Sequence, residues 1–134
     1  MSAPIDPLQI TDRGDYLLVE FAGEFGVDTG KQCIDRMAEA CERLARWKVL
    51  LDCRRMSGAM PLLARFEVAE YGASRRRELR KLALLNRAEV VLPDNFVENV
   101  ATNRGMNMKV FTDFDAAEAW LLQAATDDKA QRDG

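Results

Sequence analysis

The side chains of this chain that could do chemistry gather in one short stretch, VLLDCRRMSGAM, which spans residues 49–60. An acid ends an apolar run, two cations follow, and a hydroxyl precedes a second apolar segment; these residues are Asp52, Arg54, Arg55, Ser57 and Gly58. A serine nucleophile needs a base to activate it, and the chain contains no histidine. A nucleophilic role for Ser57 is therefore disfavoured.

Two interpretations of Ser57 remain. A phosphate on its hydroxyl would meet favourable charge from Arg54 and Arg55 and from the N-terminus of the helix that follows. Alternatively, Ser57 is a turn or capping residue, because serine commonly accepts a hydrogen bond from the first backbone amides of a helix. We favour the turn or capping role and keep the phosphorylation switch as the alternative.

A second group of charged residues lies in the segment RRRELRK, residues 75–81, which carries five cations in seven residues. It begins with Arg75, Arg76 and Arg77. Cations at the end of a helix are stabilised by the helix dipole, so a solvated basic turn is the simpler interpretation. The alternative is a docking patch for an acidic protein face, an anionic lipid or a nucleic acid. Nucleic acid is disfavoured, because aromatic side chains that could stack on bases are missing near this segment and the net charge is −3.

The absence of histidine removes the commonest general base and the commonest metal ligand, so we expect neither enzyme activity nor a cofactor. The three cysteines are Cys33, Cys41 and Cys53. Cys33 and Cys41 would lie about 12 Å apart along a helix, too far for the Cα separation of about 5.5 Å that a disulfide needs. Reduced thiols in a cytoplasmic protein are the natural expectation.

Four methionines lie around predicted loops: Met56, Met60, Met106 and Met108. Methionine adapts to irregular cavities, so filling of the core is their default role. The alternative is that they line a pocket for an apolar ligand.

The elements that must position these residues follow from hydrophobic periodicity. A β-hairpin is predicted over residues 8–21, and a helix runs from a cap at Asp28 or Thr29 to Trp47. A central strand, 47–52, precedes a helix over 61–81 whose apolar positions include Leu62. Residues 82–92 are ambiguous between one strand and two. A helix over 93–105 with Asp94 or Asn95 as its cap, a strand over 108–113 and a helix over 113–125 with Thr112 in a capping box complete the order.

The predicted order is β-β-α-β-α-β-α-β-α, which implies an α/β fold with a mixed β-sheet and packed helices. At 134 residues the chain is the size of one domain, which we place at residues 8–125. Residues 1–7 are an N-terminal extension and residues 126–134 a polar tail, expected to be disordered. No stretch approaches the length of about 20 apolar residues that a membrane span needs.

The C-terminal quarter of the chain resembles a known family. Its sequence over residues 95–121 is NFVENVATNRGMNMKVFTDFDAAEAWL, with Asn103-Arg104-Gly105, Phe111-Thr112-Asp113, and Ala116, Ala119, Trp120 and Leu121 at the matching positions. This pattern resembles the bacterial SpoIIAA-like group of STAS domains, which is related to anti-sigma-factor antagonists. The resemblance implies a STAS-like fold, docking onto a protein partner, and a phosphorylated serine at the start of the helix after the third strand.

The expected function is thus that of a non-enzymatic regulatory module that binds a protein partner through a surface around residues 53–66, with the basic helix end as a further contact. A looser resemblance of this group to lipid-carrying domains implies the alternative, a carrier or sensor of a small apolar ligand held between sheet and helices. An exposed edge strand also makes a homodimer plausible.

Overall fold

The computed structural model describes residues 7–58, 60–90 and 96–123, and it contains one five-stranded sheet. The strands are β1 (Leu8–Asp12), β2 (Leu17–Glu24), β3 (Lys48–Ser57), β4 (Lys81–Leu85) and β5 (Met108–Phe111). They lie side by side in chain order, so β3 is central. β1 pairs antiparallel with β2, and every later pair is parallel. The predicted mixed sheet is confirmed.

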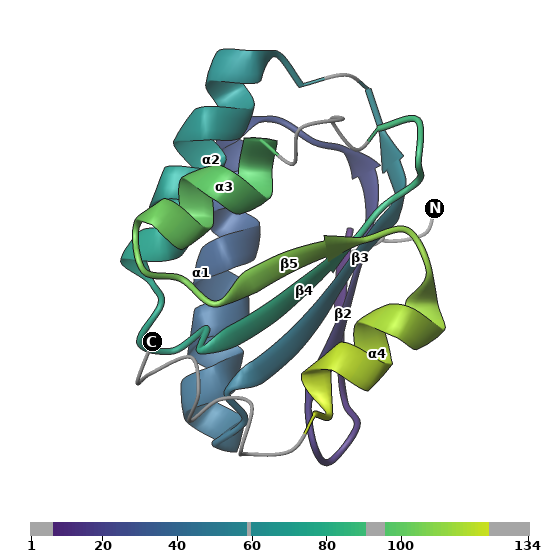
Figure 1. Cartoon of the computed structure of the whole chain (residues 1–134), viewed down its shortest axis with the longest axis vertical. Coiled ribbons are helices and arrows are strands. Elements are labelled where there is room, and N and C mark those ends of the chain that lie inside the picture. Colours follow the sequence, from purple (N-terminus) through teal and green to yellow (C-terminus); the bar gives the residue numbers. More distant parts are fainter. Residues whose placement is uncertain (1–6, 59, 91–95, 124–134) are drawn as a thin grey trace, which may run out of the picture.

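Four helices cover this sheet: α1 (Val27–Leu44), α2 (Leu62–Ser74), α3 (Phe96–Asn103) and α4 (Phe114–Leu121). The predicted order of elements is confirmed. Helices α1, α2 and α3 lie on one face of the sheet and α4 lies on the other (Figure 1). The sheet is therefore buried on both faces over β3 and β4, as parallel strands require.

Side chains along β2 alternate between the two faces of the sheet, and each face contributes to a different hydrophobic core. Leu17, Val19 and Phe21 belong to the core beneath the three helices, and Leu18 belongs to the smaller core beneath α4. This is the period-two pattern expected of a strand with two covered faces. The hairpin ahead of it turns at Gly14, whose φ of 91° is accessible to glycine at little cost.

The predicted caps of two helices are wrong. Helix α1 has Gly26 at its N-cap and no capping side chain, so neither Asp28 nor Thr29 caps it. Helix α4 is capped by Asp113, whose carboxylate accepts a hydrogen bond from the backbone amide of Ala116 at 2.9 Å, and not by Thr112. The predicted caps of α3, Asp94 and Asn95, lie outside the described residues.

Two element boundaries also differ from the prediction. Strand β3 continues past residue 52 to Ser57, because β2 is long enough to pair with it that far. Helix α2 ends at Ser74, and the basic segment that follows forms turns up to β4. Of the ambiguous segment 82–92, residues 82–85 belong to β4, and residues 88–90 form a turn. The predicted tail, 126–134, lies outside the described residues.

Candidate functional site

The end of β3 is shaped by a β-bulge. The register pairs Glu20 with Asp52 but Ala22 with Arg55, so a single residue of β2 faces two residues of β3. A bulge of this kind inserts one extra residue and reverses the alternation of side chains beyond it. Cys53 lies in the three-helix core, and three residues later Met56 also packs against it. Arg55 and Ser57 consequently project from the opposite face.

Asp52 and Arg54 form one tight ion pair on that opposite face. The Arg54 guanidinium donates from Nε to Oδ1 at 3.0 Å and from Nη2 to Oδ2 at 2.9 Å, and the Arg54 backbone amide also donates to Oδ1. Burial by itself raises the pKa of the Asp52 carboxyl, but the hydrogen bonds and charge of Arg54 outweigh it and hold that pKa below its ordinary value. Arg54 also lies over the ring of Phe114 in α4, 5.9 Å from its centroid.

Ser57 is the exposed last residue of β3, and Gly58 follows it with a φ of 83°. Helix α2 begins only at Leu62, with Pro61 at its N-cap and no capping side chain. The capping interpretation of Ser57 is therefore wrong, and the chain bends at Gly58, directly after it. Its register partner on β2 is Glu24, whose carboxylate would repel a phosphate on Ser57.

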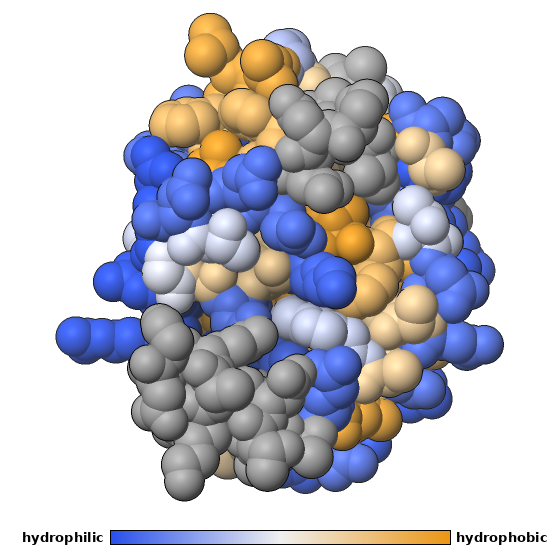
Figure 2. Space-filling model, viewed as in Figure 1, coloured by the Kyte–Doolittle hydropathy of each residue, from blue (hydrophilic) through white to orange (hydrophobic). Residues whose placement is uncertain are grey.

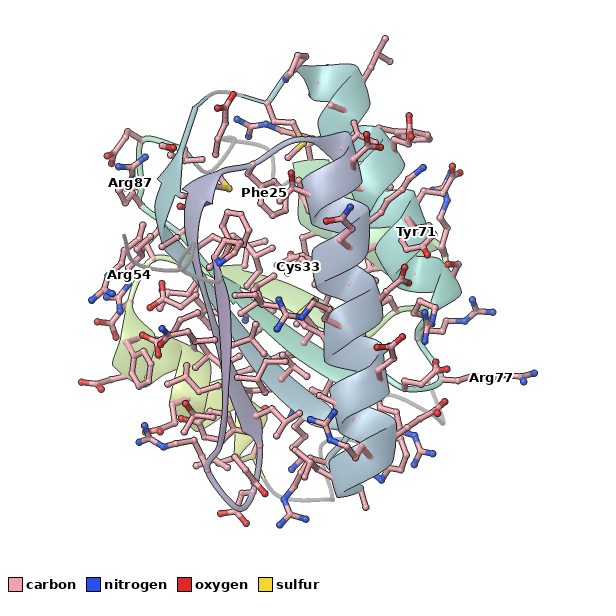
Figure 3. All side chains as sticks on the ribbon, turned by 180° about the vertical axis from the view of Figure 1, so that it is seen from behind. Phe25, Cys33, Arg54, Tyr71, Arg77 and Arg87 are labelled. Atoms are coloured by element: carbon pink, nitrogen blue, oxygen red, sulfur yellow. The ribbon has the colours of Figure 1, made fainter. Side chains whose placement is uncertain are left out.

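The second basic group is dispersed. Arg75 is the C-cap of α2 and donates from Nη1 to Oδ1 of Asp35 in α1 at 2.7 Å. Arg76 bonds to the carbonyl of Ala73 and Arg77 points away from the molecule (Figure 3). Lys81, predicted to be part of the basic helix end, instead begins β4, and its side chain is buried beside the ring of Trp120.

The structure does not bring the two basic groups together. Arg54 and Arg77 lie on opposite sides of the molecule, whereas Arg87 lies on the same side as Arg54 (Figure 3). Arg87 contacts the end of β3 through a hydrogen bond from its Nη2 to the carbonyl of Met56 at 3.4 Å. The predicted surface around residues 53–66 therefore gains Arg87 and is separate from Arg75, Arg76 and Arg77.

Two exposed leucines at the start of α2 were missed by the sequence analysis. Leu62 is 55% exposed and Leu63 is 81% exposed. Hydrophobic side chains gather at the top of the molecule, over the beginning of α2 (Figure 2). Helical periodicity placed Leu62 on the buried stripe, and this prediction is wrong because the first turn of α2 extends beyond the sheet. The signal in the sequence was the Leu-Leu pair directly after Pro61. Two adjacent residues of a helix point in different directions, so at least one of the two leucines had to be exposed.

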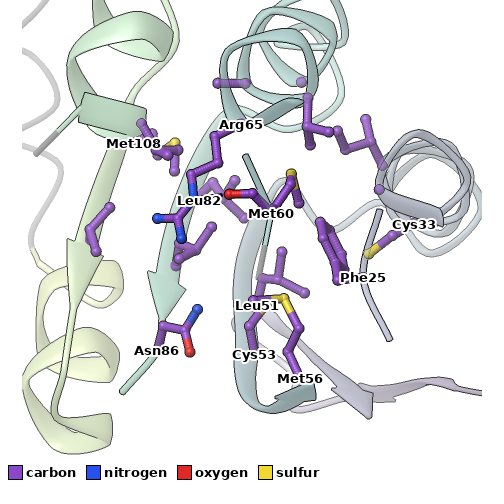
Figure 4. Close-up of a pocket in the computed structure, with 18 of the residues that line it drawn as sticks. Phe25, Cys33, Leu51, Cys53, Met56, Met60, Arg65, Leu82, Asn86 and Met108 are labelled. Carbon is purple, nitrogen blue, oxygen red and sulfur yellow. Dashed lines mark hydrogen bonds between the residues drawn. The ribbon is translucent and has the colours of Figure 1, made fainter. Parts of the chain in front are cut away.

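A cavity of about 130 Å³ lies between the sheet and helices α1, α2 and α3. All four methionines of the sequence prediction line it, together with aliphatic, aromatic and thiol side chains (Figure 4). The lining includes Phe25, Cys33, Leu51, Cys53, Met56, Met60, Val68, Leu82, Phe96, Met106 and Met108. Its two polar side chains are those of Arg65 and Asn86. The cavity lies where the sequence analysis placed the alternative ligand.

Arg65 connects the two loops beside this cavity. Its Nε donates to the carbonyl of Met60 in the β3–α2 connection at 2.9 Å, and its Nη1 donates to the carbonyl of Val90 at 3.0 Å. One side chain of α2 therefore holds both segments against the cavity.

The cysteines are buried free thiols. Burial raises the pKa of the Cys33 thiol to about 12 and that of Cys41 to about 11, and it raises the pKa of Cys53 as well. A thiolate is the nucleophilic form of cysteine, so burial disfavours a nucleophilic role for these three side chains at neutral pH. Within the described ranges no group of three acidic or cysteine side chains is arranged to hold a metal ion.

Comparison with solved structures identifies the fold. A protein of the DUF3478 family from Shewanella loihica PV-4, described as having a SpoIIAA-like fold, is 21% identical with a TM-score of 0.54, and the match covers 90% of this chain and 98% of that one. The anti-sigma factor antagonist SpoIIAA in its unphosphorylated form is 17% identical with a TM-score of 0.53, over 87% and 99%. The phosphorylated form of the Bacillus protein is 18% identical with a TM-score of 0.51, over 84% and 98%.

These structural similarities over most of both chains establish the fold, so the predicted STAS-like architecture is confirmed. No family model matches the sequence, and no curated protein matches it. None of the helices in the described part of the chain has the length and apolar character to cross a membrane.

Proposed function

We propose that this protein is a non-enzymatic regulatory module of the cytoplasm that docks onto an acidic, partly apolar face of a protein partner. The docking surface consists of Arg55 and Ser57 at the end of β3 and of Leu62 and Leu63 at the start of α2. The fold supports the proposal, because SpoIIAA, which shares it, is an anti-sigma factor antagonist.

The observation that carries the proposal is the exposure of Leu62 and Leu63. An apolar side chain that is 81% exposed, such as that of Leu63, gains free energy when a partner removes it from water. The two leucines are adjacent and stand at the tip of a helix, where a partner can reach both at once. Clustered apolar surface of this kind is typical of protein interaction sites.

Charge specifies the partner. Within the described residues no ion pair involves Arg55, so its charge is available to a partner. Arg54 and Arg87 lie nearby, each already paired with a carboxylate, Asp52 and Glu89 respectively. A partner that presents leucine-sized apolar contacts flanked by Asp or Glu would complement this surface.

The experiment compares two sets of leucine substitutions. Wild-type protein, the double variant Leu62→Asn/Leu63→Asn and the control Leu122→Asn are immobilised, and the proteins that each retains from source cells are quantified. Leu122 is 44% exposed but lies at the end of α4, on the face of the sheet opposite to helix α2 and its two leucines. We expect a protein that wild type and Leu122→Asn retain equally and that the double variant loses.

The retained protein is then titrated against each purified variant by calorimetry. The double variant should bind at least tenfold more weakly, because two well-buried leucines contribute more than the 1.4 kcal/mol that corresponds to tenfold. Indistinguishable affinities of the double variant and the control would contradict the proposed surface. A retained protein whose binding face is basic would contradict the charge assignment.

A further inference from the structure

We propose that the cavity between the sheet and helices α1–α3 is a binding site for a small carboxylic acid with an apolar body about the size of a benzene ring. This site is separate from the docking surface and does not depend on the proposed function. Three observations carry it: the volume and lining of the cavity, the amide of Asn86 and the guanidinium of Arg65.

The apolar part of the cavity matches a small hydrocarbon. Its volume is about 130 Å³, and an engineered apolar cavity of about 150 Å³ in another protein stays dry and binds benzene. Empty space of this size leaves the lining side chains without van der Waals partners on one side, which a ligand would restore. The methionines at its wall, Met56, Met60, Met106 and Met108, can adjust to the outline of a ligand.

The first polar feature is Asn86, which follows β4 and is only 5% exposed. Its Oδ1 accepts a hydrogen bond from the backbone amide of Arg87 at 2.9 Å. Its Nδ2 donates to no acceptor among the described residues, although Asn86 lines the cavity. The hydrogens on Nδ2 are therefore free to donate at the cavity wall, so the site favours a ligand that brings an acceptor.

The second polar feature is Arg65, a half-buried cation at the same cavity. Its Nε and Nη1 donate to neutral carbonyls, and among the described residues no carboxylate forms an ion pair with it. Among those residues the positive charge of the guanidinium is therefore uncompensated, and the hydrogens on Nη2 have no acceptor. A carboxylate is the acceptor that matches both the charge and the planar donor geometry of arginine.

The two polar groups lie on one side of the cavity. Arg65 reaches down from α2 toward the sheet, and Asn86 projects from the end of β4 below it (Figure 4). A carboxylate between them would accept from the Arg65 guanidinium and from Nδ2 of Asn86, while its apolar body filled the space beside the methionines. A single negative charge would balance the single cation, which favours a monocarboxylate.

The test uses three probes that separate the apolar body from the head group: benzoate, benzyl alcohol and acetate. Each is titrated into the ¹⁵N-labelled full-length protein, and shifts of amide signals around the cavity report binding. We expect benzoate to bind at least tenfold more tightly than benzyl alcohol, because hydrogen bonds between oppositely charged groups are stronger than those to a neutral hydroxyl. Acetate should cause no shifts at millimolar concentration.

Two variants test the head group. Arg65→Met should reduce the affinity for benzoate to that for benzyl alcohol while retaining benzyl alcohol binding, which shows that the cavity is intact. Arg77→Met is the matched control, since it removes an arginine that points into solvent on the far side of the molecule, and it should change neither affinity. Arg65→Lys keeps the charge but not the planar fork, and it should give an intermediate affinity for benzoate.

The outcomes are distinct. Equal affinities of wild type for benzoate and benzyl alcohol, or unchanged benzoate binding by Arg65→Met, would overturn the assignment of a carboxylate. Failure of both aromatic probes to bind would overturn the ligand site itself. Neither result bears on the docking surface, whose leucines do not line the cavity.

Discussion

At the scale of single residues, neighbours decide what each reactive side chain can do. Asp52 has a lowered pKa because Arg54 holds it, and the three thiols have raised pKa values because they are buried. Ser57 is accessible, but Glu24 is its cross-strand neighbour. Negative charge at position 57 is therefore opposed by Glu24, even though Arg55 projects from the same face.

This arrangement predicts the effect of a charge at Ser57. Ser57→Glu should lower the free energy of unfolding by about 0.2–1 kcal/mol, because like charges would then lie opposite each other on neighbouring strands. Ser57→Gln introduces a neutral side chain of the same size as Glu and should destabilise the fold less. Adding Glu24→Gln to Ser57→Glu removes the repulsion and should recover the lost stability. Urea denaturation measures all four proteins.

Partner binding should respond more strongly than stability, since Ser57 belongs to the docking surface. Calorimetry with the partner of the wild-type protein makes the comparison. If Ser57→Glu and wild type bind equally well, the placement of Ser57 in that surface is wrong and a phosphorylation switch at this position is rejected.

At this scale the sequence identified the reactive side chains but not their partners. The pairing of Asp52 with Arg54 spans two residues of one strand, and it was missed because the sequence pattern ended that strand at residue 52. The positions of Asn86 and Arg65 at the cavity wall were not found either, because they depend on residues distant in sequence. The methionines were recognised as candidates, since methionine suits irregular cavities whatever encloses them.

At the scale of elements, the contact between α1 and α2 sets the shape of the cavity. A Cβ added at Gly30 of α1 would lie 3.0 Å from Cγ2 of Val68 and 3.1 Å from Cε1 of Phe25. A Cβ added at Gly72 of α2 would meet Cδ1 of Ile34 at 3.5 Å, an ordinary contact. Only the first glycine is required by close packing.

A matched pair of alanine substitutions tests this difference. Gly30→Ala should destabilise the fold by about 1 kcal/mol, because an overpacking cost of about 1–3 kcal/mol exceeds the gain in helix propensity. Gly72→Ala should stabilise it by about 0.5–1 kcal/mol, because the gain in propensity is unopposed. Urea denaturation measures both changes in the free energy of unfolding, provided that the m-values of the variants match that of wild type. Equal effects at the two positions would contradict the close approach of Gly30 to Val68 and Phe25.

The elements themselves were largely predictable, and their ends were not. The sequences of helix α1 and strand β2 have clear hydrophobic periods, because the helix buries one continuous stripe and the strand alternates between two faces. The caps at Gly26 and Asp113 were missed, since several candidate side chains stand near each helix start and tertiary contacts choose between them. Strand β3 extends over polar residues that local propensity alone would place in a loop, because β3 pairs with β2 along this part.

At the scale of the whole molecule, charge is divided between two sides. Arg54 and Arg87 lie on one side of the molecule, and Arg77 lies on the other (Figure 3). The sequence could not show this separation, because distances in sequence between the basic residues do not fix their positions around the sheet.

Reversing charges on the two sides should affect partner binding differently. Arg55→Glu should weaken partner binding at least tenfold, because it replaces attraction to an acidic face with repulsion. The double variant Arg76→Glu/Arg77→Glu should leave affinity within about twofold at 0.15 M salt, where charges more than about 8 Å away are largely screened. Calorimetry at that salt concentration distinguishes them, and a comparable loss in both proteins would place the second basic group in the interface.

The bulge in β3 also makes the strand tolerant of one particular shortening. Deleting Arg54 would remove the extra residue and restore regular pleating, and every later side chain of the strand would keep its side of the sheet. The guanidinium of Arg55 would stay in water and the thioether of Met56 would stay against the hydrocarbon interior. A deletion that would exchange the dry and wet surfaces of a regular strand is therefore absorbed at this one point.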